Sequence, residues 1–138
     1  MIPRVVLDTN VVVSALLKPQ GLEDQVFRLA LAGRLLLCLS PAVQVEYARV
    51  LPGPKFKLRP EEVATTLRQL EKTGSLFHPA RTLRTSAHEP DNRFYECADA
   101  AQAAFLVTGN FKHFSKDYKV TKIVNARKLL DLLGASQV

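Results

Sequence analysis

Polar side chains able to bind a cation or a phosphate follow two apolar runs of the sequence, at the point where each run stops. Asp8 comes directly after residues 4–7, and Asn110 follows residues 105–108 in the stretch FLVTGN. Short apolar runs rich in β-branched residues are typical of buried strands. Asp8 and Asn110 are therefore the first candidates for a functional site at the ends of two strands.

Two further carboxylates lie on expected helices. Glu46 stands in the middle of a helix, on a side that it shares with Val43 and Val50. A glutamate near an apolar seam is costly to bury unless its charge has a partner. Asp91 opens the helix EPDNRFYECADAAQAAF, which runs directly into the strand at 105–108. The start of that helix must therefore lie near one edge of the sheet.

Each of these residues also has a purely structural interpretation. Asp8 is a suitable helix N-cap, although Asn10 would cap the same helix equally well. Asp91 is again a good capping residue, Glu46 would be an ordinary solvated glutamate, and an asparagine after glycine, as at Asn110, favours a turn. Individually the signals are weak, and only their combination points to a shared pocket.

A pocket built from several carboxylates has a specific chemical requirement. The negative charges repel one another and raise their own pKa values unless a cation sits among them. Ligands that are all oxygen select hard cations such as Mg²⁺ or Mn²⁺. The chain carries 19 basic and 13 acidic residues, for a net charge of +6, which favours a polyanionic partner. The expected chemistry is therefore metal-assisted reaction at phosphate.

The elements that must position these residues alternate between strands and helices. We expect strands at 4–7, 35–39, 75–78, 105–108 and 122–124, helices at 11–17, 22–32, 41–51, 60–72, 91–103 and 126–133, and a loop at 79–90. This alternation predicts an α/β fold with a parallel sheet covered on both faces, in a single domain over residues 1–138. Sites in such sheets lie outside the carboxyl ends of the strands, where Asp8 is expected.

Several blocks of the sequence resemble the motifs of PIN-domain proteins. VVLDTNVVVSALL resembles the family's first motif, SPAVQVEYARVL its second, and EPDNRFYECADAAQAAFLVTGNFKHF its third and fourth. The blocks cover nearly the whole chain in the family's order, and are most similar to the bacterial toxins of toxin–antitoxin pairs, relatives of VapC. The resemblance implies a PIN-like three-layer α/β/α sandwich with a central parallel sheet, and a Mg²⁺- or Mn²⁺-dependent endoribonuclease.

The resemblance also assigns roles to individual residues. The catalytic and metal-binding carboxylates would be Asp8, Glu46 and Asp91. Supporting roles would belong to Thr9, Asn10, Asn92, Asp99, Thr108 and Asn110. The chain departs from the family in two places, because Asn110 stands where many members have a fourth acid and either Asp91 or Asn92 stands in the register of the third. Fewer acids weaken metal binding, so the alternative is a catalytically weakened PIN-like module that binds RNA or a protein partner.

The expected partners follow from the same resemblance and from the charge. Single-stranded or structured RNA would be guided by basic side chains in two stretches of the chain. One stretch carries Lys55, Lys57 and Arg59, and the other carries Lys112, His113, Lys116 and Lys119. A cognate antitoxin and a homodimer are implied, in a cytoplasmic protein without a membrane span.

Other metal and redox chemistry has little support in the sequence. The histidines at positions 78, 88 and 113 are expected to be separate surface or turn residues without zinc-type spacing. Cys38 and Cys97 are expected to be free thiols.

Other enzyme classes lack a required residue or motif. An aspartate-nucleophile phosphatase of the haloacid dehalogenase type needs a second aspartate two residues after Asp8, where this chain has Asn10. The sequence also lacks the GxSxG elbow of serine hydrolases and the glycine-rich loops of nucleotide-binding proteins.

Overall fold

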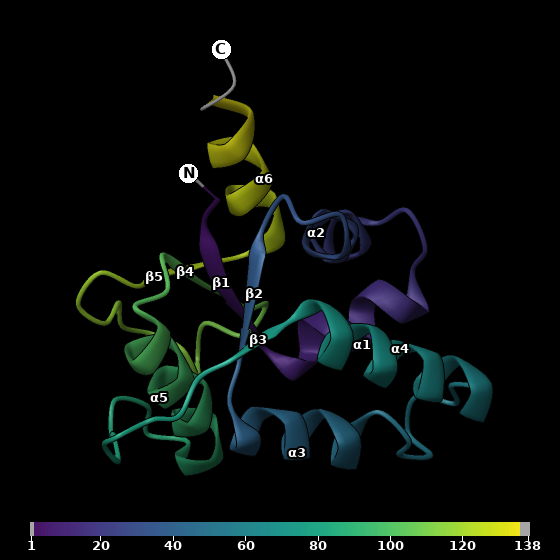
Figure 1. Ribbon diagram of the computed structural model, residues 1–138, viewed down its shortest axis with the longest axis horizontal. Helices are drawn as coiled ribbons and strands as arrows, with labels where there is room; N and C mark the ends of the chain where they lie inside the picture. The colour runs from purple at the N-terminus through teal and green to yellow at the C-terminus, as the bar shows by residue number, and fades with distance from the viewer. Residues whose placement is uncertain (1, 136–138) are drawn as a thin grey trace.

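A central parallel sheet organises the computed structural model, which describes residues 2–135 (Figure 1). Within those residues the strands are β1 (Arg4–Leu7), β2 (Leu36–Leu39), β3 (Ser75–Leu76), β4 (Phe105–Val107) and β5 (Lys122–Val124). Their order across the sheet is β3-β2-β1-β4-β5, and every pairing is parallel. The predicted parallel α/β sheet is confirmed, with β1 at its centre.

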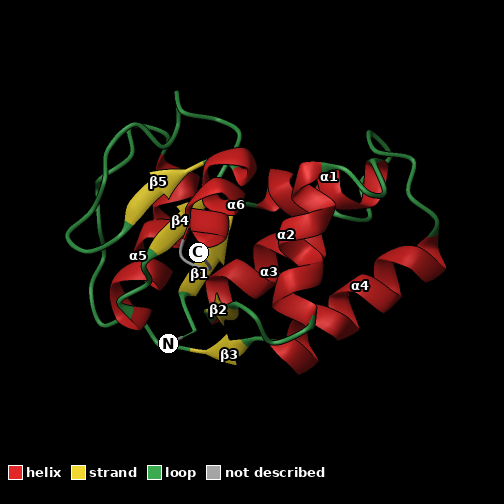
Figure 2. Ribbon diagram, turned by 90° about the horizontal axis from the view of Figure 1, so that it is seen from above, coloured by secondary structure: helices red, strands yellow, loops and turns green. Residues whose placement is uncertain are grey.

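Helices cover both sides of this sheet. They are α1 (Thr9–Leu17), α2 (Leu22–Leu31), α3 (Pro41–Val50), α4 (Pro60–Thr73), α5 (Asn92–Ala101) and α6 (Ala126–Ala135). Seen from above, α5 lies on one side of the strands and α2 on the other (Figure 2). The predicted elements are present with ends shifted by at most a few residues. The short 3₁₀ turn η1 (Glu89–Asp91) was not predicted and closes the long loop before α5.

The central strand β1 is buried because helices pack on both faces of the sheet. Val5, Val6 and Leu7 of β1 have no exposed surface. Burial of each such side chain is worth about 1.5–3 kcal/mol. Cys38 and Cys97 are buried in the same core as free thiols, as predicted, and burial raises their pKa values to about 11 and about 12.

Local sequence signals explain where two of these helices begin or end. The Ser40 hydroxyl accepts a hydrogen bond from the backbone N–H of Val43, and Pro41 occupies the first turn of α3. Gly33 adopts a left-handed conformation, with φ of 76°, directly after α2. These devices fix the course of the chain into β2 and from β2 into α3, the helix that carries Glu46.

The end of β1 is held from two directions. The backbone N–H of Asp8 donates to the carbonyl of Val107 over 2.9 Å, so the β1–β4 ladder continues one residue beyond the strand. The Tyr47 hydroxyl donates to the carbonyl of Leu7 over 2.5 Å, which fastens α3 to the same point. Asp8 therefore projects from a rigid position. Over the residues described, the helices fall short of the length and apolar character that a bilayer crossing requires.

Candidate active site

A cleft of about 400 Å³ opens next to Asp8, just beyond the end of β1. The three predicted catalytic carboxylates, Asp8, Glu46 and Asp91, all line it. The supporting residues Thr9, Asn10 and Asn110 line it as well, together with the basic residues Lys55 and His113. A larger cavity of about 880 Å³ lies around Arg4, at the other end of β1. Among residues 2–135, those that line it include no carboxylate and no imidazole. Of these two cavities, the smaller cleft is therefore the candidate site, because it gathers the carboxylates and imidazoles.

Asp8 occupies the N-cap position of α1, but its side chain makes no capping hydrogen bond. Its Oδ2 instead accepts a hydrogen bond of 2.8 Å from the Thr108 hydroxyl, which in turn accepts one of 3.0 Å from the backbone N–H of Asn110. Asp8 thus stands at the N-cap position, as the capping interpretation expected, but the hydrogen bond that its side chain accepts comes from Thr108. The contact joins the ends of two neighbouring strands, β1 and β4.

The environment of Asp8 disfavours its charge. Asp8 is only 5% exposed, and burial raises the pKa of its carboxyl from 3.8 to about 6. The hydrogen bond from Thr108 lowers the pKa, whereas the negative charge of Asp91 raises it further. A buried carboxylate with a perturbed pKa, facing a second carboxylate across a cleft, is a feature of functional sites.

Asp91 is contacted by two histidines. Its Oδ2 lies 2.9 Å from Nδ1 of His88 and 2.8 Å from Nδ1 of His113. The two imidazole rings are stacked, with centroids 4.0 Å apart and planes 5° from parallel. The expectation of three unrelated histidines is therefore wrong for His88 and His113, because the loop before α5 brings them together. His78 stands apart on the surface.

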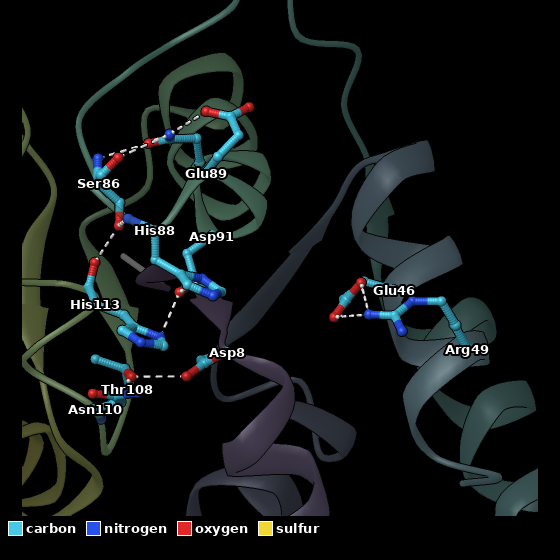
Figure 3. A network of polar contacts seen from close by, with 11 residues as sticks. Asp8, Glu46, Arg49, Ser86, His88, Glu89, Asp91, Thr108, Asn110 and His113 are labelled. Atoms are coloured by element: carbon cyan, nitrogen blue, oxygen red, sulfur yellow. Dashed lines mark hydrogen bonds and ion pairs between the residues drawn. The ribbon is translucent and has the colours of Figure 1, made fainter.

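Glu46 reaches the cleft from the opposite wall. Figure 3 shows it on α3, across from Asp8, with its carboxylate turned toward Arg49. Both carboxylate oxygens lie 3.0 Å from the same nitrogen, Nη2 of Arg49, and the glutamate side chain is 26% exposed. The structure thus places Asp8 and Asp91 close enough for their charges to interact. Glu46 lines the same cleft, but it forms an ion pair with Arg49 of its own helix.

Three of the predicted supporting residues, Thr108, Asn92 and Asp99, lie outside the lining of the cleft, although Thr108 contacts Asp8 directly. Asn92 is fully buried, and its amide bonds both the backbone N–H and the carbonyl of Ser86 and the carboxylate of Glu89. Asp99 forms an ion pair of 2.8 Å with Arg81 and lines a different cavity. Asn92 therefore holds the preceding loop in place, and Asp99 lies outside the cleft that the predicted metal ligands line.

The basic residues predicted to guide RNA are divided by the fold. Lys55 and His113 line the cleft, whereas Lys57, Lys112 and Lys116 are exposed and lie outside its lining. Lys119 lies 3.7 Å from Asp99, in the other cavity. The positive charge at the cleft itself therefore comes from Lys55 and from Arg49, which the sequence interpretation missed.

Two residues of the cleft had a usable signal in the sequence. His88 stands three residues before Asp91, and Arg49 stands three residues after Glu46 on one helix, which is the spacing of facing side chains. His113 follows Asn110 by three residues. The contact between the two histidines has no such signal, because it depends on the path of the loop at 79–90.

The donor set of the cleft fits a divalent cation. Asp8 and Asp91 are carboxylates whose mutual repulsion a cation between them would relieve. Thr9, beside Asp8, carries a buried hydroxyl that has no hydrogen-bond partner among residues 2–135. Asp8 and Asp91 are the residues that would hold such an ion, and Glu46 would join them on leaving Arg49.

Comparison with known proteins agrees with this architecture. A family model described as PIN domain matches residues 4–112. The chain is 24% identical over 110 residues to the uncharacterized protein MJ1680 of Methanocaldococcus jannaschii, a match that spans 78% of this chain and 70% of that protein.

Two solved structures share the fold. VapBC2 from Rickettsia felis, bound to a DNA fragment from their promoter, has a TM-score of 0.60 at 21% identity, over 87% of this chain and 98% of that one. PAE2754 from Pyrobaculum aerophilum has a TM-score of 0.63 at 13% identity, over 97% and 90% of the two chains. The predicted PIN-like α/β/α sandwich is confirmed by these likenesses and by the sheet.

Proposed function

The chain belongs to the PIN-domain family, and from that membership we propose that it is a metal-dependent endoribonuclease that hydrolyses RNA phosphodiester bonds. The observation that carries the proposal is the pair Asp8 and Asp91 in one cleft, with the pKa of Asp8 raised by burial and by its neighbour. Such a pair is expected where a divalent cation binds.

Asp8, Asp91 and Glu46 would hold Mg²⁺ or Mn²⁺. When bound, the ion supplies Lewis-acid activation of water and of a phosphoryl oxygen. Thr108 fixes the orientation of the Asp8 carboxylate through its hydrogen bond. Asn110, at the same strand end, is a neutral group suited to a hydrogen bond with water or phosphate. Lys55, an exposed residue in the lining of the cleft, would attract the RNA backbone.

We further propose that the chain acts in a cytoplasmic toxin–antitoxin pair, as a homodimer with a cognate antitoxin. The likeness of fold to VapBC2 from Rickettsia felis supports an antitoxin partner. Exposed apolar residues support burial by another chain: Val45 on α3 is 65% exposed and Leu17 of α1 is 53% exposed. Co-purification with the product of a neighbouring gene tests the pairing directly.

Replacement of Asp8 by asparagine tests the nuclease proposal. Asp8→Asn keeps the size of the side chain and an oxygen for Thr108, but removes the charge that would hold the cation. We expect cleavage of RNA in the presence of Mn²⁺ to fall by about 100-fold or more. Asp131→Asn, an exposed acid on α6, is the matched control and should cut as fast as the parent. Cleavage by the purified Asp8→Asn protein at the parental rate would refute the mechanism.

A non-catalytic PIN-like module is the second candidate function. Its support is the ion pair between Glu46 and Arg49, together with Asn92 and Asn110 in places where acids were expected. This candidate predicts RNA or protein binding that does not change in EDTA, and no cleavage at any Mn²⁺ concentration. The nuclease predicts the opposite on both counts.

A further inference from the structure

We propose that His88, Asp91 and His113 form a binding site for a transition-metal ion, such as Zn²⁺, Co²⁺ or Ni²⁺, at the edge of the cleft. Each residue offers one ligand atom, and these atoms all lie within 4.8 Å of one another. Binding of the ion to the free protein does not depend on ribonuclease activity, so the two proposals are tested separately.

Two of the three separations between the ligand atoms match those around a bound ion. With metal–ligand bonds of about 2.0–2.1 Å, neighbouring ligand atoms lie roughly 3 Å apart. Nδ1 of His88 and Nδ1 of His113 lie 2.9 Å and 2.8 Å from Oδ2 of Asp91. An ion therefore needs only small movements of the three side chains. The parallel stacking of the two rings, 4.0 Å apart, also places both Nδ1 atoms at the same carboxylate oxygen (Figure 3).

One buried serine holds the two histidines in this arrangement. The Ser86 hydroxyl donates to the backbone carbonyl of His113 over 2.5 Å and accepts from the backbone N–H of His88 over 3.1 Å. Asn92 in turn bonds both backbone polar groups of Ser86. The site is thus fixed from behind by contacts between the loop before α5 and the segment after β4, which is how outer residues position metal ligands.

The ligand types determine which ions this site prefers. Oxygen ligands alone favour Mg²⁺ and Mn²⁺, whereas two imidazoles with one carboxylate suit Zn²⁺, Co²⁺, Ni²⁺ and related ions. Asp91 faces Asp8 on one side and contacts both histidines on the other. The two types of ion would therefore compete for the same Asp91 carboxylate. The rest of the ligand shell is open to water, as the cleft is.

Metal titration of the untagged protein tests the site, with Zn²⁺ followed by calorimetry and Co²⁺ by its visible absorption. The chain contains three histidines, so His78→Ala is a matched control for His88→Ala and His113→Ala. We expect each cluster variant to bind Zn²⁺ at least about 10-fold more weakly, and the Co²⁺ absorption to lose intensity, while His78→Ala matches the parent.

Two further variants separate this site from the carboxylate pair. Asp8→Asn should leave Zn²⁺ affinity within a few-fold of the parent, because Asp8 is not one of the ligands. Ser86→Ala, which keeps all ligands, should weaken Zn²⁺ binding while thermal melting confirms that it is folded. The proposal is overturned if folded His88→Ala and His113→Ala bind Zn²⁺ as tightly as the parent. It is equally overturned if only Asp8→Asn loses binding, since the ion would then sit on carboxylates alone.

Discussion

The hydroxyl of Thr108 donates a hydrogen bond to Oδ2 of Asp8 over 2.8 Å, although 100 positions of sequence separate the two residues. The same hydroxyl accepts from the backbone N–H of Asn110. Because a hydroxyl has a single hydrogen, its orientation is fixed by these two contacts. Thr108 therefore specifies the position of the Asp8 carboxylate from the neighbouring strand.

Thr108→Val should lower stability and activity together. Valine preserves the shape of threonine, but the buried carboxylate of Asp8 and the amide of Asn110 each lose a partner. The expected loss in the free energy of unfolding is about 1–3 kcal/mol, measured by urea denaturation. Thr108→Ser retains the hydroxyl and should recover most of the RNA cleavage. Equal cleavage by the valine and serine variants would show that this hydrogen bond does not matter.

Asp8 should make the metal-free protein less stable as the pH rises. Its pKa is raised from 3.8 to about 6 on folding, so between these values the folded protein binds the proton more tightly than the unfolded chain does. The stability contributed by the protonated carboxyl is complete below pH 3.8 and is lost as the pH rises to about 6.

The matched comparison is Asp8→Asn in EDTA. The difference between the two pKa values corresponds to roughly 3 kcal/mol at most, so the variant should exceed the parent by about 1–3 kcal/mol at pH 7. Urea denaturation of both proteins at several pH values measures this gain, which should vanish near pH 4. A gain that does not change with pH would show that burial of the charge is not its cause.

Release of Glu46 from Arg49 should strengthen metal binding. Both carboxylate oxygens of Glu46 contact one nitrogen of Arg49, and a positive charge so close competes with a cation for the same oxygens. We expect Arg49→Ala to bind Mn²⁺ several-fold more tightly in calorimetry without RNA. Arg68→Ala, on α4, is the control because the Arg68 guanidinium donates to the Thr65 hydroxyl on its own helix and lies outside the lining of the cleft. Weaker Mn²⁺ binding by Arg49→Ala would contradict this account.

Asn92→Asp should destabilise the fold without improving activity. The Asn92 amide donates to the carbonyl of Ser86 and to the carboxylate of Glu89, and an aspartate would offer neither hydrogen and would add a buried charge beside Glu89. The expected loss is about 3 kcal/mol in urea denaturation. If the variant instead gains RNA cleavage at parental stability, Asn92 occupies a catalytic register after all.

The sequence predicted the sheet well because its signals are local. Arg4–Leu7 and Phe105–Val107 are short, apolar and followed by polar residues, and those features alone indicate buried strands whose ends carry the site. The position of Asp8 follows directly. The location of Glu46 in the same cleft follows from the helix that comes after β2.

The contacts of these carboxylates could not be predicted in the same way. The pair formed by His88 and His113, and the burial of Asn92 against Ser86, depend on an irregular loop whose path no periodicity specifies. The ion pair of Glu46 and Arg49 was visible as a three-residue spacing, but spacing alone does not say which of several partners a side chain chooses. The periodicity of the sequence thus predicts where a residue lies in the fold better than it predicts which side chain that residue contacts.

The central position of β1 in the sheet also determines when the cleft can form during translation. This strand leaves the ribosome before β4, with which it pairs, because the residues of β4 are made about a hundred positions later. At translation rates of roughly 5–20 residues per second, some 5–20 s pass between the appearance of Asp8 and that of Thr108. Throughout that interval Asp8 lacks the neighbour that orients it, so a nascent or prematurely terminated chain cannot yet form the assembled cleft.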